Sequence, residues 1–212
     1  MKRHLFVVLL MAAVCPVRAA QPEAETLYRG NFAIGRLGAV FSPCFSATRI
    51  VVEDATAGEM LTAAYREISE QAGRAIFVEF SGRKSNGGLR AQRLHRASRG
   101  GPGCRERLLE LKFAALGSEP VWGLEARAAN VRLRLWGESA PREFPPGNFV
   151  AAQAEARYEG ATPTSLLRVI VRPGICRDTL SGSIFDHRVE IQLDARILRG
   201  CGYWGDLGRA SP

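Results

Sequence analysis

The first half of the chain alternates short apolar stretches with glycines and polar turns. Residues 27–41 contain two such stretches around a group of glycines, which predicts two strands joined by a tight turn. Three further stretches of the same kind occur at residues 49–53, 74–80 and 89–97. A Gly-Gly-Pro-Gly segment at residues 100–103 then interrupts regular structure and marks a candidate domain edge.

One segment between these strands has helical periodicity. In residues 58–73 the apolar positions recur every three or four residues, at Leu61, Ala64, Tyr65 and Ile68. This spacing places them on one face of a helix, and a glycine ends the segment. A single helix packed on strands is compatible with a five-stranded OB-type barrel.

The second half of the chain is expected to be entirely β. Alternating apolar and polar residues predict strands at residues 122–128, 131–136, 150–158, 165–171, 188–193 and 197–201. Short polar turns separate the first two and the last two, which predicts two hairpins. We therefore expect a mainly β fold, with an OB-like five-stranded barrel carrying one helix over residues 27–112. A small all-β meander domain follows over residues 113–207.

The N-terminus has the features of a targeting segment. A basic start precedes ten apolar residues at positions 5–14, and small or modest residues occupy the cleavage positions before Ala20. This pattern predicts a secretory signal peptide over residues 1–19, cleaved near Ala19. The apolar run is too short to span a bilayer. A lipid anchor on Cys15 is the alternative, although Val14 stands where a lipoprotein signal prefers a small residue.

The composition is that of an ordinary globular protein. Of the 212 residues, 46% are hydrophobic, 8% aromatic and 24% charged, which excludes wholesale disorder, collagen-like repeats and coiled coils. The formal net charge is +8, and loss of the three basic residues in the signal peptide leaves +5. The mature chain is therefore only modestly basic.

The positive charge is concentrated in one segment. Between residues 83 and 107, eight basic residues stand against one acidic residue. Six of the basic residues are candidate anion-binding residues: Arg83, Lys84, Arg90, Arg93, Arg96 and Arg99. The expected partner is an anionic envelope surface with peripheral membrane association, and no nucleic acid is expected in an exported chain. The alternative is a solvated strand and loop.

Four cysteines follow the signal peptide, and an even number in an exported chain indicates disulfides. Three pairings are open, and proximity along the chain favours Cys44 with Cys104 and Cys176 with Cys201. The sequence contains no Cys-x-x-Cys motif, and the mature chain has two histidines. We therefore expect no metal site and no cofactor.

The spacing of several residues in both halves supports a resemblance to envelope proteins. The first half carries Tyr28-x-Gly30-x-Phe32, Phe41-x-x-Cys44, Leu61-x-x-x-Tyr65, Ile76-Phe77-Val78-x-Phe80-x-Gly82-Arg83 and a closing Cys104. The second half carries Gly117-Ser118-Glu119-Pro120-Val121-Trp122, Cys176-x-Asp178-x-x-Ser181-Gly182 and Leu198-Arg199-Gly200-Cys201-Gly202. The first half resembles the OB-type C-terminal domain of the NlpE envelope lipoproteins. The second half resembles a domain of uncharacterised bacterial envelope proteins.

This resemblance implies a binding or sensing role in the cell envelope, as an NlpE-like adaptor. The Cys-x-x-Cys motif of the NlpE N-terminal domain does not occur in this sequence. The resemblance therefore does not extend to metal or redox sensing. A periplasmic inhibitor of a hydrolase such as lysozyme and a binder of anionic envelope lipids are the alternative functions.

Three motifs of the second half are candidate binding residues, each with a structural alternative. Asp178 and Ser181 could bind a ligand beside a disulfide or cap a turn. Glu119 and Trp122 could form a recognition edge, or the tryptophan could belong to the core. The aromatic pair Tyr203 and Trp204 is a candidate exposed surface, because glycines flank it.

The sequence offers little support for catalysis. Asp186 and His187 suggest a triad with Ser181 or Ser183, but adjacent side chains in a strand point to opposite faces. We therefore do not expect Asp186 to orient His187. A Gly-x-Ser-x-Gly motif is absent from the sequence, and paired glycosidase carboxylates have no visible signature. The expected function is non-catalytic binding, with an envelope protein as the other candidate partner.

Overall fold

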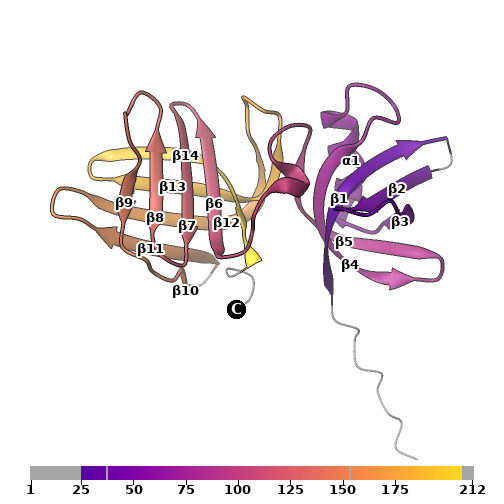
Figure 1. Ribbon diagram of the computed structural model, residues 1–212, viewed down its shortest axis with the longest axis horizontal. Helices are drawn as coiled ribbons and strands as arrows, with labels where there is room; N and C mark the ends of the chain where they lie inside the picture. Colours follow the sequence, from indigo (N-terminus) through magenta and orange to yellow (C-terminus); the bar gives the residue numbers. More distant parts are fainter. Residues whose placement is uncertain (1–24, 37, 153, 207–212) are drawn as a thin grey trace, which may run out of the picture.

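The computed structural model describes residues 25–36, 38–152 and 154–206 (Figure 1). The signal peptide predicted at residues 1–19 and the alternative anchor Cys15 lie outside the described residues. The described chain is mainly β, as the alternating pattern predicts. Within this part of the chain, no helix is long and apolar enough to cross a membrane.

The first five strands form a closed barrel. They are β1 (Thr26–Gly35), β2 (Gly38–Pro43), β3 (Ile50–Asp54), β4 (Ile76–Ser85) and β5 (Gly88–Ser98). Antiparallel pairing runs in the order β3-β2-β1-β4-β5, and a parallel pairing of β3 with β5 closes the ring. The OB-like barrel with one helix is therefore confirmed.

Helix α1 (Met60–Ile68) lies between β3 and β4 and buries the predicted face, Leu61, Ala64, Tyr65 and Ile68. It is shorter than the expected 58–73 at both ends: Gly58 and Glu59, in the 3-10 turn Ala57–Glu59, have positive φ before it, and Ser69 is extended after it. The Asp54 carboxylate accepts a hydrogen bond from the backbone N–H of Thr62 at 2.7 Å. This contact satisfies one of the free N–H groups at the helix start.

The remaining nine strands continue the same fourteen-stranded sheet beyond the barrel, and we call this part the second sheet. They are β6 (Leu111–Ser118), β7 (Val121–Arg127), β8 (Val131–Leu135), β9 (Arg142–Phe144), β10 (Val150–Ala152), β11 (Glu155–Ala161), β12 (Leu166–Arg177), β13 (Ile184–Leu193) and β14 (Arg196–Trp204). A short 3-10 turn, Gly103–Arg105, precedes β6. The strand order is β10-β11-β12-β13-β14-β6-β7-β8-β9, so chain neighbours pair as in a meander and β14 returns to β6.

Both halves of this second sheet contribute to one apolar core. Phe113, Trp122 and Leu133 from β6, β7 and β8 pack in the same cluster as Val169 and Ile191 from β12 and β13. The sheet is therefore curved around its own core, with β6 to β9 on one side and β11 to β14 on the other (Figure 1). The expected division after residue 112 falls inside β6, which pairs with β7 and β14.

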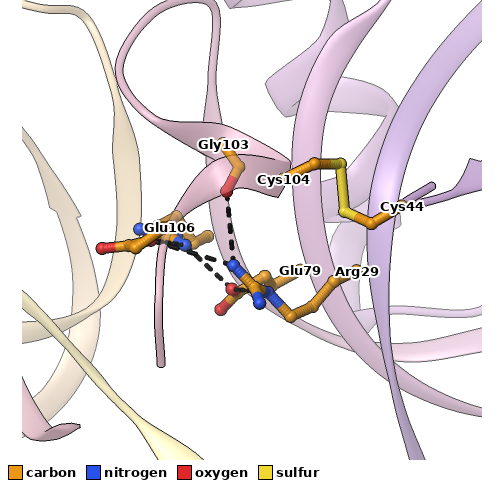
Figure 2. The surroundings of a disulfide bond; sticks show 7 residues. Arg29, Cys44, Glu79, Gly103, Cys104 and Glu106 are labelled. Atoms are coloured by element: carbon orange, nitrogen blue, oxygen red, sulfur yellow. Dashed lines mark hydrogen bonds and ion pairs between the residues drawn. A yellow bond between two sulfur atoms is a disulfide. The ribbon is translucent and has the colours of Figure 1, made fainter. Parts of the chain in front are cut away.

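Two disulfides join the cysteines as expected, Cys44 with Cys104 and Cys176 with Cys201. Figure 2 shows the first, which fastens the segment before β6 to the barrel wall. Disulfides form and persist in oxidising compartments. The pair therefore indicates an oxidising location outside the cytoplasm.

Candidate functional site: the groove beneath a folded hairpin

Strand β13 connects the two parts of the protein. At its start, Ile184 and Phe185 pair with Ala97 and Arg96 of β5. The rest of the strand lies between β12 and β14 in the second sheet. The barrel and the second sheet are therefore joined by backbone hydrogen bonds.

The end of the β12–β13 hairpin, residues 174–185, is bent, joined to β14 at Cys176 and paired with β5 at Ile184 and Phe185; we refer to it as the folded hairpin. A register shift between Pro173 and Cys176 bends the hairpin, and Gly174 within the bend has a φ of 146°. The Cys176–Cys201 disulfide fastens the bent segment to β14. Its position is thus fixed covalently.

The tip of the folded hairpin contacts both parts of the protein. The Thr179 and Ser118 hydroxyls are hydrogen-bonded at 2.6 Å, which joins the tip to the end of β6. Arg177 donates from Nε to Glu67 on α1 at 2.7 Å, which joins the tip to the barrel. These contacts place the hairpin beside both the second sheet and the barrel, as one wall of a groove.

A groove of about 710 Å³ lies between this wall and the outer face of β12, β13 and β14; we call it the hairpin groove. Glu119 from the β6–β7 turn and Asp178 from the hairpin both line it, so the structure brings these two candidates together. Its other lining residues include Ser118, Arg172, Arg188, Glu190, Ile197 and Arg199. The sequence did not indicate these arginines and Ile197 as site residues. The alternation of apolar and polar positions predicts only that they lie on a solvent-facing side of a strand.

The charges in the hairpin groove are mixed and unevenly paired. Arg199 lies 3.4 Å from Glu190, and Arg172 lies 2.8 Å from Glu155. Arg188 is directly opposite Arg172 and donates from Nε to the Ile175 carbonyl at 3.1 Å. Among the described residues, Arg188 has no ion-pair partner. Two like charges in cross-strand positions destabilise a sheet, so a bound carboxylate here would relieve that repulsion.

Asp178 and Ser181 act as turn residues. The Asp178 side chain is buried, and its carboxylate accepts hydrogen bonds from the Ser181 backbone N–H at 2.8 Å and the Ser181 hydroxyl at 2.6 Å. These bonds close the tip of the folded hairpin. The structure thus favours the capping alternative: Asp178 lines the groove, Ser181 does not, and the Asp178 carboxylate is taken up by the bonds to Ser181.

Trp122 belongs to the core of the second sheet, whereas Glu119 is exposed. The indole covers Gly117 and Gly200, where a Cβ would lie 2.3 Å and 2.8 Å from its atoms. Side chains at those two positions would displace the ring. The recognition role predicted for Trp122 is therefore corrected to a packing role.

Tyr203 is buried and Trp204 is partly buried, so the candidate exposed surface at this pair is corrected to a packing role. Tyr203 is buried and stacks on Phe185 with ring centroids 5.8 Å apart. Trp204 packs against Phe113 and Phe149, with centroids 4.7 Å and 5.2 Å away. The flanking glycines permit this packing, because a Cβ at position 202 would meet Phe113 at 2.4 Å.

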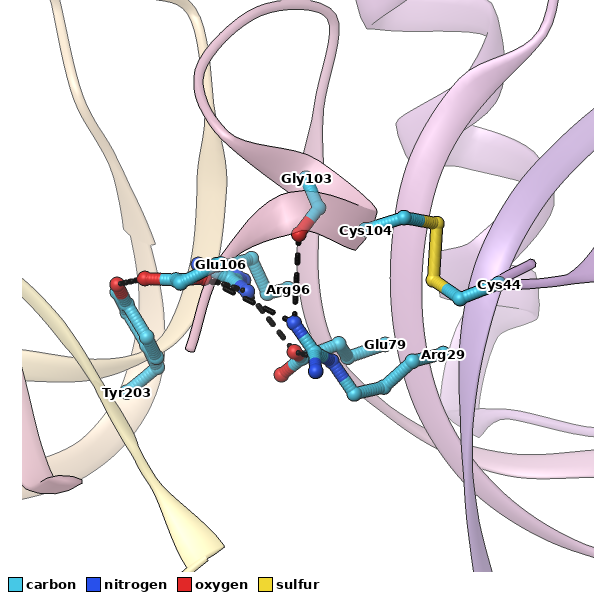
Figure 3. Close-up of polar contacts among 8 residues, drawn as sticks. All are labelled: Arg29, Cys44, Glu79, Arg96, Gly103, Cys104, Glu106 and Tyr203. Carbon is cyan, nitrogen blue, oxygen red and sulfur yellow. Dashed lines mark hydrogen bonds and ion pairs between the residues drawn. A yellow bond between two sulfur atoms is a disulfide. The ribbon is translucent and has the colours of Figure 1, made fainter. Parts of the chain in front are cut away.

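Arg96 lies at the centre of a buried ion network between the barrel and the second sheet (Figure 3). Its guanidinium donates to Glu79 at 2.8 Å and to Glu106 at 2.6 Å, and Arg29 donates to Glu79 at 2.6 Å. Tyr203 donates its hydroxyl to Glu106 and lies beneath the guanidinium. Burial raises the pKa of Tyr203, which keeps the hydroxyl protonated as the donor. The predicted anion-binding role of Arg96 is corrected: it is a structural residue.

The other basic candidates do not form one surface. Arg90 pairs with Glu53 at 3.1 Å, and Arg99 pairs with Glu70. Of the three that remain, Arg83 and Lys84 lie on β4 near the turn of that hairpin, and Arg93 lies in the middle of β5 opposite Ser81. The segment from 83 to 107 is therefore divided between structural contacts and one end of the barrel.

Asp186 does contact His187, which corrects the expectation from strand geometry. Its two carboxylate oxygens bind His187 Nδ1 at 2.5 Å and His95 Nδ1 at 2.7 Å. Burial opposes ionisation of Asp186, but the hydrogen bonds with His187 and His95 outweigh it and lower its pKa. Trp204 donates its indole N–H to His187 Nε2 at 3.1 Å.

This last contact decides what His187 can do. An indole nitrogen is a donor only, so His187 Nε2 accepts and the ring proton lies on Nδ1, toward Asp186. Both nitrogens are occupied, and no free lone pair remains to accept a proton from a substrate. Within the described residues, no group of three His, Cys, Asp or Glu side chains is arranged to hold a metal ion.

Comparison with models of protein families, with curated proteins and with solved structures finds no match to this chain. The resemblance to the NlpE lipoproteins stays a prediction.

Proposed function

We propose that this chain is an exported, non-catalytic binding protein of the bacterial envelope that acts as an NlpE-like adaptor or sensor. The observation that carries the proposal is the hairpin groove, a hollow with a covalently fixed wall and mixed charge. We propose that it receives a segment of an envelope protein partner. Location in the periplasm after cleavage near Ala19 is part of the proposal, and lipid anchoring at Cys15 is its alternative.

The chemistry of the groove suits a protein partner. Arg188 offers a guanidinium for a carboxylate, Glu119 offers a carboxylate for a basic side chain, and half-exposed Ile197 offers apolar contact. Such a combination of charged and apolar groups is typical of a protein interface. A groove that is held rigid loses less conformational entropy when it binds.

The inhibitor alternative depends on a protruding loop around Asp178 and Ser181 that could enter an active-site cleft. In the structure, Asp178 is buried and Thr179 is bonded to Ser118, while residues 179–182 at the tip are exposed. The Asp178 carboxylate is already bonded to Ser181 and is not free to bind in a cleft, and on that ground we prefer the adaptor.

A photo-crosslinking amino acid at position 197 tests this proposal in cells that express the full chain. We expect one discrete adduct with an envelope protein, weakened when Arg188→Glu reverses the groove charge. The matched control carries the crosslinker at exposed Val150 on β10, outside the groove. Identical adducts from both positions, or none from position 197, would contradict a partner in the groove.

A further inference from the structure

One end of the barrel combines free positive charge with exposed apolar side chains. Three registers define this end: Thr26 of β1 lies opposite Gly82, Phe41 of β2 opposite Ile50, and Val51 of β3 opposite Gly88. The loop at residues 44–49 and the β4–β5 turn therefore lie at the end where β1 begins. The β4–β5 hairpin points away from the second sheet (Figure 1). We call this region the basic end; it comprises Phe45, Arg49, Val51, Arg83, Lys84, Arg90 and Arg93.

The basic end has more positive charge than the fold can neutralise. Glu53 pairs with Arg90, and Glu25 accepts a hydrogen bond from the Ser81 hydroxyl at 3.0 Å. Four cations of the basic end have no ion-pair partner among the described residues: Arg49, Arg83, Lys84 and Arg93. Arg83 also lies directly opposite Arg90 on the neighbouring strand. Such like-charge neighbours destabilise a hairpin, and an anionic surface would offset that cost.

Exposed apolar side chains accompany these cations. Phe45 is 88% exposed and Val51 is 59% exposed. Phe45 also has a φ of 61°, a conformation that is rare for a bulky residue. Exposed apolar side chains at the same end of a barrel as free Arg and Lys side chains are a combination that suits the interface of an anionic bilayer.

We propose that the basic end docks on an anionic lipid bilayer, with Phe45 inserted among the headgroups and the free cations on lipid phosphates. This inference rests on the proposed function in one respect, because export brings the chain to such a surface. The hairpin groove lies on the second sheet, so docking leaves it open to a partner.

Sedimentation with vesicles tests the docking surface on the purified chain without residues 1–19. We expect binding to phosphatidylcholine vesicles that contain a third of phosphatidylglycerol, weak binding to pure phosphatidylcholine, and a steep loss with added salt. Each basic side chain near such a surface contributes roughly fivefold to partitioning. Lys84→Gln with Arg93→Gln should therefore weaken binding about 25-fold, and Phe45→Ser about tenfold.

A matched variant separates the location of charge from its amount. Arg168→Gln with Arg196→Gln removes the same charge from the second sheet and should change vesicle binding less than about twofold. Equal losses in both double variants, or salt-insensitive binding, would overturn the docking surface. Binding to a single-stranded oligonucleotide would also overturn it, if the affinity equals that for vesicles and Phe45→Ser leaves it unchanged. That result would indicate a general polyanion site.

The vesicle assay and the crosslinking assay fail independently. Absence of vesicle binding with a discrete adduct at position 197 would reject the membrane surface and keep the adaptor. Vesicle binding without that adduct would reject the groove partner and keep the membrane surface. The two results therefore assign failure to one proposal or the other.

Discussion

At the scale of single residues, the junction depends on a carboxylate with no exposed surface. Glu79 is 0% exposed and accepts hydrogen bonds from Arg29 and Arg96. Burial opposes the charged form of Arg96, but Glu79, Tyr203 and Glu106 outweigh it, so the pKa of Arg96 is raised. A buried cation of this kind is tolerated only while its partners remain.

Glu79→Gln should lower the free energy of unfolding by about 3 kcal/mol, because it leaves two guanidinium groups without their shared anion. Urea unfolding at neutral pH measures this loss. Glu70→Gln is the matched control, since Glu70 pairs with Arg74 and Arg99 at the surface. It should cost less than about 1 kcal/mol. Similar losses in the two variants would show that the buried network has no special role.

The residue scale is also where sequence reasoning was least reliable. Alternation correctly assigns neighbouring side chains to opposite faces, yet it does not predict that Asp186 reaches back to His187. Asp186 lies where β13 passes from β5 to the second sheet, and its two oxygens bind histidines from both parts. The run of basic residues around Arg96 likewise predicts a surface cation. Its partners Glu79 and Glu106 are distant in the sequence, so the local pattern does not reveal the buried ion network.

At the scale of elements, periodicity predicted the helix face and most strands. It placed the ends of β12 and β13 at residues 171 and 188, whereas the strands continue to Arg177 and begin at Ile184. The difference is the folded hairpin. Judged from neighbouring residues alone, Pro173 and Gly174 indicate that the strand ends there. The bent segment instead continues as a strand, and the disulfide that holds it joins it to β14, which is distant in the sequence.

Removal of the Cys176–Cys201 disulfide should release the folded hairpin. Its cysteines are 25 residues apart, and a loop of that length is worth about 3.5 kcal/mol in the chain-entropy model. For Cys176→Ala with Cys201→Ala, we expect that loss in urea unfolding and faster amide hydrogen exchange in residues 177–185. Mass spectrometry of peptides measures the exchange.

The other disulfide provides the control for this prediction. Cys44→Ala with Cys104→Ala should also destabilise the protein, because it opens a longer loop of 60 residues. It should not accelerate local exchange in residues 177–185 beyond the global effect. If the two double variants gave the same exchange pattern, the hairpin would be held by its other contacts and not by its disulfide.

At the scale of the whole molecule, the two halves share a core. Ile184 comes from the second half of the sequence, yet it is fully buried in the barrel cluster with Phe80 and Leu94. A division of the chain at residue 112 separates these side chains. Sequence patterns are local, so they indicated two β-rich halves and could not predict that β13 belongs to both.

This shared core predicts that the barrel and the second sheet unfold together. Ile184→Ala leaves a cavity in the barrel and should cost about 2–4 kcal/mol. If the protein unfolds as one unit, peptides from β2 and from β8 should lose the same amount of protection against hydrogen exchange, although β8 does not touch the cavity. Val150→Ala, at an exposed position on β10, should change neither. A loss of protection confined to β2 would mean that the barrel opens alone. In that case the contact of Arg177 with Glu67, which joins the folded hairpin to the barrel, would break while the second sheet stays folded.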